Sequence, residues 1–273
     1  DHVESLVNLD AAGGGRLDPD TVMGPGSWRA ARLAAGAGLV AIDGLRNGDA
    51  EVAFCAVRPP GHHATPTRTM GFCLLNNVAV AAASLADAGE RVAIVDIDAH
   101  HGNGTQEAFV ADGRVLFVSC HQWPLYPGTG AADEVGIGDG TGATINVPLP
   151  AGAAGDTYRY AMDILVAPAV ERFAPDWILV SAGFDAHRAD PLTDLGLSAG
   201  DYADLMGRLT GLVPTGRLIA FLEGGYDLGA LADSAGAFVA AALGVRYSPE
   251  ATTGDGPGRD VVDAQVVRHG LVS

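Results

Sequence analysis

Short runs of Val, Ile, Leu and Phe recur along the chain, and each run ends in residues that favour turns or carry polar side chains. Apolar runs of about four to eight residues are typical of strands that are buried on both faces of a parallel sheet. The pattern predicts five such strands, at Val52 to Val57, Val92 to Ile97, Val115 to Ser119, Trp177 to Ser181 and Leu218 to Leu222.

Helical periodicity separates most of the predicted strands. Residues 128–155 are rich in Gly and Pro, which predicts a loop with one short strand at Thr144 to Val147. The alternation of strands and helices predicts an α/β fold, with an open, mostly parallel sheet and helices on both of its faces. The expected helices are Asn76 to Ala88, Thr157 to Phe173, Ala199 to Leu212 and Leu228 to Leu243.

Length and composition indicate a single globular domain. The 273 residues are 48% hydrophobic and 18% charged, enough to bury one large core over residues 1–273. Residues 249–273 contain the run T-T-G-D-G-P-G-R-D and are expected to form a loose, peripheral surface tail. No apolar run reaches the roughly 20 residues of a membrane span, and the first residues lack the features of an export signal. We therefore expect a cytoplasmic protein with no membrane partner.

The charge balance excludes one class of partner. Thirty-three acidic residues face 16 arginines, which gives a net charge of -17 and argues against direct binding to a nucleic-acid backbone. A cationic substrate would be attracted instead. Cys55, Cys73 and Cys120 lie in or beside apolar runs without metal-type spacing, so we expect buried free thiols.

The second apolar run ends in D-I-D-A-H-H-G-N-G, at residues 96–104. Asp96, Asp98 and His100 alternate, so on a strand they share one face. Carboxylates and an imidazole gathered at one point of an apolar core require a cation or a hydrogen-bond network, and the expectation at the end of a strand is a metal site.

Polar residues follow the other predicted strands as well. In an open parallel sheet the carboxyl ends of the strands meet at one edge, where ligands bind. Each of these residues also has a purely structural interpretation. Asp185 could be the N-cap of a helix, Tyr226 could be an aromatic residue that packs beside a turn, and Glu223 could bind backbone groups. Together they favour a catalytic site at this edge, whereas the isolated His2, His187 and His269 are expected to be structural. The segments at the strand ends are R-P-P-G-H-H, S-C-H, G-F-D-A-H and E-G-G-Y-D.

The predicted ligands are Asp98, His100 and Asp185, two oxygen donors and one nitrogen donor. This mixture suits Zn²⁺ or Fe²⁺ with a coordination position left open for water. Neighbouring imidazoles and a Tyr hydroxyl would complete a set of groups suited to metal-assisted hydrolysis of an amide.

Six motifs in this order resemble the zinc-dependent histone deacetylases and their bacterial relatives, including histone deacetylase-like and acetylpolyamine amidohydrolases. The resemblance runs from about Asp1 to about Gly244, and the N-N-V and H-G-N-G segments are closer to the class II and bacterial branch. It implies the arginase/deacetylase-like fold. The motifs are R-P-P-G-H-H-A, G-F-C-L-L-N-N-V-A, D-I-D-A-H-H-G-N-G, Y-P-G-T-G, S-A-G-F-D-A and E-G-G-Y.

The resemblance implies a role for each active-site residue. Asp98, His100 and Asp185 would bind Zn²⁺, with Fe²⁺ as the other metal. His63 would be the general base and then the general acid, and His62 its electrostatic partner. Asp96 would form a hydrogen bond with His62. Asn103 would orient His63, in place of the Asp found in class I. Tyr226 would polarise the acyl carbonyl.

The resemblance also implies substrate and cation sites. Gly71 and Phe72 would form one wall of an acyl-lysine tunnel, Tyr126 the facing wall, and Leu192 would lie near the mouth. Structural potassium ions would bind in two places. The first site would involve Asp96, Asp98, His100, Ser119 and Cys120, and the second Phe109, Asp112 and Val115.

One departure concerns the N-terminus, because the family carries a further strand and a loop before the position matching Asp1. Either the sequence is a fragment or a processed form, or the natural protein is short and the rim of its site is open or completed by another subunit. An uncovered sheet edge or apolar surface would favour a homo-oligomer.

The leading hypothesis is a zinc-dependent amidohydrolase that removes acetyl or other acyl groups from acyl-lysine or related acylamines. Leu192 favours acetyl-lysine, whereas an acidic residue at its position would suit cationic polyamines, so an acetylpolyamine amidohydrolase is the first alternative. A binuclear manganese ureohydrolase would need a second Asp and His cluster that the sequence does not provide. A non-catalytic acyl-ligand binding or scaffold protein is the alternative from another class; His62, His63 and Tyr226 count against it.

Overall fold

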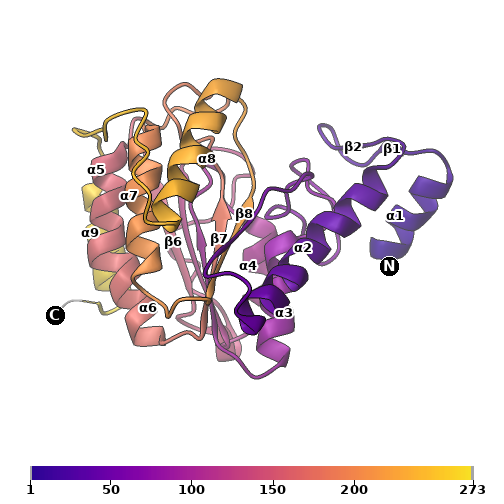
Figure 1. Cartoon of the computed structure of the whole chain (residues 1–273), viewed down its shortest axis with the longest axis horizontal. Helices are drawn as coiled ribbons and strands as arrows, with labels where there is room; N and C mark the ends of the chain where they lie inside the picture. Colours follow the sequence, from indigo (N-terminus) through magenta and orange to yellow (C-terminus); the bar gives the residue numbers. More distant parts are fainter. Residues whose placement is uncertain (1, 272–273) are drawn as a thin grey trace.

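The structure, a computed structural model, describes residues 2–271 and consists of a central sheet with helices on both sides (Figure 1). The six strands of this sheet are all parallel, in the order β3-β8-β7-β4-β5-β6. The predicted α/β fold with a parallel sheet is confirmed. The strands are β3 (Ala53–Cys55), β4 (Val92–Asp96), β5 (Val115–Gln122), β6 (Thr144–Leu149), β7 (Trp177–Ala182) and β8 (Leu218–Leu222).

The helices divide between the two faces of the sheet. The four predicted helices are present, and α1, α2, α4 and α9 are additional. The helices are α1 (His2–Ala11), α2 (Ser27–Asn47), α3 (Asn77–Asp87), α4 (Asn103–Phe109), α5 (Gly155–Ala161), α6 (Ala167–Phe173), α7 (Ala199–Thr210), α8 (Leu228–Ala242) and α9 (Arg259–Arg268), with a short 3-10 turn η1 (Gly138–Gly140). None of the helices within residues 2–271 is long and apolar enough to cross a membrane.

Strand β4 illustrates how the two cores form. Its side chains alternate between the faces of the sheet, as strand geometry requires. Ala93 and Val95 belong to the core cluster under α5 to α9, whereas Val92 and Ile94 belong to the cluster under α2 and α3. All four side chains have no solvent exposure, which is why the run is apolar on both faces and not alternating.

The N-terminal elements lie to one side of the sheet, to the right in Figure 1. There α1 and the two-residue antiparallel strands β1 (Gly15–Arg16) and β2 (Val22–Met23) pack at the end of α2. Their small core cluster contains Leu6, Met23, Ala31 and Leu74. Because Leu74 follows the G-F-C motif, this cluster connects the N-terminal elements to one wall of the site.

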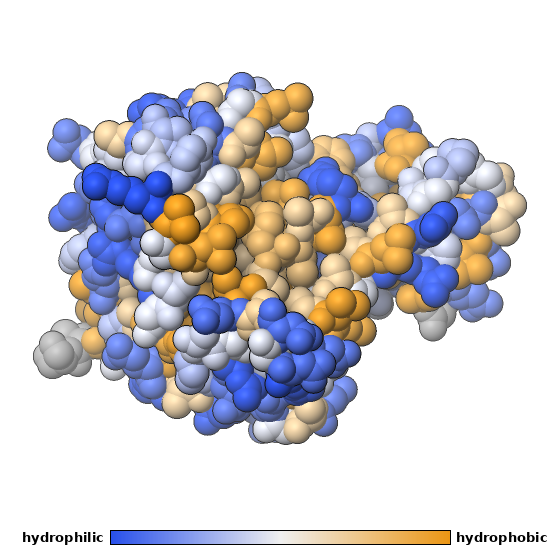
Figure 2. All heavy atoms as spheres, in the orientation of Figure 1, coloured by the Kyte–Doolittle hydropathy of each residue, from blue (hydrophilic) through white to orange (hydrophobic). Residues whose placement is uncertain are grey.

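Apolar side chains also gather on the surface between α2 and α8, in the middle of the face shown in Figure 2. Leu33 and Val40 of α2 and Leu243 after α8 are more than half exposed. The adjacent strand β3 is at the end of the sheet and pairs, within the described residues, with β8. A homo-oligomer stays a prediction.

The helix predicted at Thr157 to Phe173 is interrupted. A π-helical turn, η2 (Met162–Val166), joins α5 to α6, and the N–H of Ala167 bonds the carbonyl of Met162, five residues earlier. The physical reason is Pro168 in the first turn of α6, which has no N–H and whose ring crowds the carbonyl four residues before it.

The expectation of a loose tail after Ser248 is wrong. Helix α9 packs against α5, η2 and β6, and its side chains Val262 and Gln265 are buried. Before it, the N–H of Thr253 and its hydroxyl bond the carboxylate of Asp201 in α7. The packing of this segment was not predicted, because residues 254–258 are rich in Gly and Pro and few apolar residues anchor the segment to the core.

The buried position of Val262 leads to a stability prediction. Val262→Ala removes two buried carbon atoms and should lower the free energy of unfolding by about 2 kcal/mol. Val267→Ala, on the same helix but 69% exposed, is the matched control and should change it by less than about 0.5 kcal/mol. Urea unfolding of both variants measures the difference, and equal midpoints would mean that α9 does not contribute to the fold.

Candidate metal centre and active-site pocket

The carboxyl ends of β3, β4, β7 and β8 bring the predicted residues to one edge of the sheet. Asp98 and His100 follow β4, Asp185 follows β7, and Tyr226 follows β8. Parallel pairing of β4 with β7 aligns Asp96 with Ser181, so both loops start at the same level of the sheet. The sheet topology therefore brings four segments that are distant in the sequence together at one site.

Asp98, His100 and Asp185 form a buried cluster whose ligand atoms all lie within 4.8 Å of one another. The Nδ1 atom of His100 is 3.2 Å from Oδ1 of Asp98 and 2.9 Å from Oδ2 of Asp185. Two carboxylates and one imidazole in this arrangement fit a metal site with an open position for water. Within residues 2–271 it is the single cluster of this kind, so the second cluster of a binuclear ureohydrolase is not formed there.

Backbone groups hold the two carboxylates in place. The N–H of Gly224 donates to Oδ2 of Asp98 at 2.8 Å, and the N–H of Ala99 donates to Oδ1 of Asp185 at 2.8 Å. A Cβ atom on Gly183 would lie 2.0 Å from Oδ2 of Asp98. The glycines of the S-A-G-F-D-A and E-G-G-Y motifs thus leave room for the carboxylates.

The cluster is electrostatically coupled. Burial raises the pKa of Asp185 to about 6, with a further contribution from the Asp98 charge. Burial opposes the charged form of His100, yet the carboxylates of Asp185 and Asp98 raise its pKa to about 11. The carboxylates therefore need a positive charge between them, which a divalent cation supplies when the imidazole is a neutral ligand.

Two further histidines, His62 and His63, lie beside the cluster and are 2% and 4% exposed. Nδ1 of His62 is 3.0 Å from Oδ2 of Asp96, and Nδ1 of His63 is 2.8 Å from Oδ1 of Asn103. Their ring centroids are 4.0 Å apart. The structure thus forms both of the pairs that the resemblance implied.

The environments of the two rings push their pKa values apart. Burial disfavours the charged form of His62, but the carboxylates of Asp98 and Asp96 raise its pKa to about 10. Burial and the neighbouring His62 charge hold the pKa of His63 well below its usual value. The two environments thus favour the charged form of His62 and the neutral form of His63, whose Nδ1–H is donated to Asn103 and whose Nε2 can accept a proton.

Glu223 supports the loop that carries these histidines. Its Oε2 accepts hydrogen bonds from the N–H groups of Gly61 at 2.6 Å and His62 at 3.1 Å. Burial raises its pKa to about 7. Glu223 therefore binds backbone groups, which is one of the two interpretations that the sequence left open.

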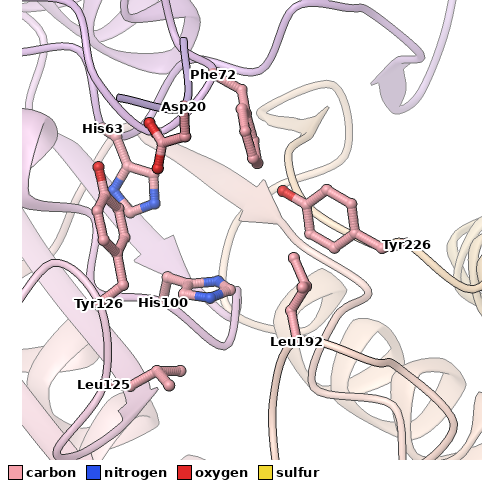
Figure 3. Close-up of a pocket in the computed structure, with 9 residues that line it drawn as sticks. Asp20, His63, Phe72, His100, Leu125, Tyr126, Leu192 and Tyr226 are labelled. Carbon is pink, nitrogen blue, oxygen red and sulfur yellow. The ribbon is translucent and has the colours of Figure 1, made fainter. Parts of the chain in front are cut away.

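A pocket of about 270 Å³ reaches the cluster at His100, which lines it (Figure 3). The four residues expected to bind substrate all line it. A Cβ on Gly71 would lie 2.3 Å from the His63 ring, so glycine is required for this wall to approach the histidine. The lining residues are Asp20, His63, Gly71, Phe72, His100, Leu125, Tyr126, Leu192 and Tyr226.

Asp20 and Leu125 are pocket residues that the sequence did not reveal. Asp20 belongs to the loop between β1 and β2, where the carboxylate of Asp18 accepts bonds from the N–H groups of Asp20 and Thr21. Thr21 in turn accepts the N–H of Phe72 at 3.0 Å. D-P-D-T has the composition of an ordinary turn, and only the tertiary contact with Phe72 places it at the pocket.

The residues expected at potassium sites are also close together. Asp96 pairs with Ser119 in the sheet, and Cys120 is buried beside it. In the second group, the N–H of Asp112 bonds the carbonyl of Phe109, and the N–H of Val115 bonds that of Asp112. Potassium binding stays a prediction.

The fold and the site define an α/β protein with a buried cluster that fits a metal at the carboxyl edge of a parallel sheet. Residues 1–242 match the family model of the histone deacetylase domain, and the chain belongs to this family. The expected family is confirmed.

Several known proteins are similar to this chain. A protein of Archaeoglobus fulgidus described as a probable deacetylase is 46% identical over 234 residues, which are 83% of this chain and 65% of that protein. The histone deacetylase-like amidohydrolase of Pseudomonas aeruginosa is 42% identical over 236 residues, 83% of this chain and 61% of that protein. The crystal structure of the HDA15 HD domain matches with a TM-score of 0.90 at 39% identity, over 98% of this chain and 75% of that one. The chain thus spans somewhat less than two thirds of the two relatives.

Proposed function

We propose that the chain is a zinc-dependent amidohydrolase that removes acetyl or other acyl groups from acyl-lysine or related acylamines. The observation that carries this proposal is the buried Asp98, His100 and Asp185 cluster, whose His100 lines the same pocket as His63 and Tyr226. The relatives described as deacetylase and amidohydrolase support the same class of reaction.

The three ligands would hold Zn²⁺, with Fe²⁺ as the other metal that suits two carboxylates and one imidazole. The metal would act as a Lewis acid and lower the pKa of a bound water to about 7. The N–H groups of Gly224 and Ala99 would each hold one oxygen of a carboxylate and so fix the orientation of Asp98 and Asp185 at the metal site.

His63 would move the proton. Its Nε2 would accept a proton from the attacking water, because burial favours the neutral ring and Nδ1–H is already donated to Asn103. The same Nε2 then returns the proton to the leaving amine. His62, charged and bonded to Asp96, would stabilise negative charge that develops beside it.

Tyr226 would donate a hydrogen bond from its hydroxyl to the acyl oxygen as negative charge forms there. Burial raises the pKa of this hydroxyl, so it stays protonated and keeps its proton to donate. In Figure 3 the hydroxyl of Tyr226 points into the pocket, across from His63 and His100.

The pocket walls would hold the alkyl chain of the substrate. Phe72 and Tyr126 provide aromatic walls, and the Tyr126 ring lies edge-on to His63 with centroids 5.2 Å apart. An unbranched lysine side chain fits between aromatic rings at little cost in polar contacts. A structural potassium ion near Asp96 and Ser119 remains part of the proposal.

An acetylpolyamine amidohydrolase is the second candidate, and Asp20 is the observation that favours it. Asp20 lines the pocket, and its carboxylate would attract the free ammonium groups of a polyamine. Leu192, 46% exposed in the same pocket, favours the alkyl and peptide groups of acyl-lysine substrates.

Leu192 provides a test of this choice. Leu192→Glu would place a second carboxylate at the pocket and should lower the KM for acetylspermidine about fivefold, the equivalent of about 1 kcal/mol for an exposed ion pair. The KM for a neutral acetyl-lysine peptide should stay within about twofold. Leu192→Gln is the uncharged control, and an equal effect of Gln and Glu would exclude electrostatic selection.

Metal content and hydrolysis of acetyl-lysine peptide and acetylspermidine by the purified chain test the function itself. About one zinc per chain with turnover of either acylamine is the expected result. A folded, zinc-loaded chain that hydrolyses neither substrate would overturn the proposal and favour a binding protein.

A further inference from the structure

Residues 248–253, after α8, lie across the loop that joins β7 to α7. They follow the residues 1–242 that match the family model. The hydroxyl of Ser198 donates to the carbonyl of Ala251 at 2.7 Å, and that of Thr253 donates to Asp201 at 2.7 Å. This segment is therefore attached to the start of α7, next to the loop that carries Asp185.

Glu250 makes the contacts that reach into this loop. Its Oε2 accepts the Nε2–H of His187 at 2.7 Å and the N–H of Ala199 at 2.9 Å, while its other oxygen pairs with Arg188. Nδ1 of His187 accepts the N–H of Ala189 at 3.1 Å, so the ring proton must lie on Nε2. Burial opposes the charge of Glu250, but the N–H of Ala199 and the His187 ring lower its pKa to about 2.

The loop continues this chain of hydrogen bonds to the pocket. The N–H of Asp190 donates to the carbonyl of His187 at 2.8 Å. The carboxylate of Asp190, 7% exposed, then accepts two backbone N–H groups, from Leu192 at 3.0 Å and from Tyr226 at 2.7 Å. Asp190 thus joins the backbones of two pocket residues that lie in different loops, Leu192 after β7 and Tyr226 after β8.

We propose that Glu250 is a positioning residue for Tyr226: through His187 and Asp190 it holds the Tyr226 backbone, and so the hydroxyl, at the correct place in the pocket. This inference rests on the proposed function for its kinetic consequence. Glu250 itself does not line the pocket and would not touch the substrate. His187 is then a structural residue, as expected from the sequence, and its hydrogen bonds connect Glu250 to the loop that carries Asp190.

The kinetic effect should fall on kcat. A Tyr226 hydroxyl displaced by a fraction of an ångström still leaves the pocket open to substrate but stabilises the developing oxyanion less. Misplacement of this kind lowers rates by about 10- to 100-fold, so Glu250→Ala should lower kcat about tenfold with zinc still bound.

Three variants separate positioning from stability. Glu250→Gln keeps an oxygen that can accept the hydrogen bonds of His187 and Ala199, so its kcat should stay within about twofold of that of the parent. Arg188→Ala removes the exposed ion pair alone and should have little effect. Thr253→Val loosens the same segment at Asp201 without touching His187, and should lower the melting temperature but not kcat.

Hydrogen exchange at the Tyr226 amide gives a readout that does not depend on activity. This N–H is donated to Asp190, so Glu250→Ala should speed its exchange more than about tenfold, whereas Glu250→Gln and Thr253→Val should not. If the parent protein shows no turnover, the proposed function fails, yet the exchange rates still decide this inference.

Unchanged Tyr226 exchange and unchanged kcat in Glu250→Ala would overturn the proposal, as would equal losses in Glu250→Ala and Thr253→Val. Should Glu250→Ala not fold, Glu250→Asp replaces it, because its carboxylate is one methylene short of the His187 ring and the same two readouts decide.

Discussion

Asp185→Asn is expected to abolish zinc binding and to lower amide hydrolysis by more than about 10³-fold, the equivalent of several kcal/mol of lost metal catalysis. The amide oxygen of Asn can still accept the N–H of Ala99, so the loop keeps its buried hydrogen bond. What is lost is one of the two carboxylate charges that surround His100. Metal analysis after dialysis, together with the hydrolysis rate, measures both effects.

The choice of Asn matters for interpretation. Asp185→Ala would leave the buried N–H of Ala99 without a partner, at a cost of about 1 to 3 kcal/mol, and unfolding would then be confused with metal loss. Asp204→Asn, on partly exposed α7, is the control for removal of one negative charge and should keep zinc. Retention of one zinc per chain by Asp185→Asn would remove Asp185 from the ligand set.

The part of the site that could be predicted from the sequence is the part carried by strand ends. The apolar run before Asp96 is buried on both faces, and parallel pairing then forces the residues that follow Asp96, Ala182 and Leu222 to one edge. Asp98, His100 and Asp185 meet for this reason. The sequence expectation that Asp98 and His100 continue the alternation of a strand is not met, because β4 ends at Asp96 and both ligands lie in the loop after it.

Features that depend on tertiary contacts were missed. Helix α2 contains Gly36, Gly38 and Gly44, which lower its intrinsic helix propensity and conceal it. Gly38 is needed because a Cβ there would lie 2.8 Å from the Phe221 ring. Asp20 likewise reaches the pocket only through the contact of Thr21 with Phe72. Neither requirement can be read from neighbouring residues in the sequence.

Tyr226→Phe is the second substitution with a large expected effect. It removes one hydroxyl and leaves the ring, its contact with Phe72 and the zinc ligands in place. If the hydroxyl stabilises the oxyanion, kcat should fall about 10²- to 10³-fold, because the interaction is stronger in the transition state than with the ground-state carbonyl. Steady-state kinetics with an acetyl-lysine peptide should find KM changed by less than about threefold.

Tyr126→Phe is the matched control, since the chain offers a second tyrosine in the same pocket. The hydroxyl of Tyr126 lies at the side of Asp20 in Figure 3 and is not directed across the pocket as that of Tyr226 is. Its removal should therefore change kcat by less than about threefold. Turnover that disappears in Tyr226→Phe and survives in Tyr126→Phe would exclude a non-catalytic scaffold, because a binding protein has no transition state for one phenol to stabilise. Equal, small effects of the two substitutions would assign oxyanion stabilisation to another group, and His62, 3.8 Å from Asp98, would be the next residue to test.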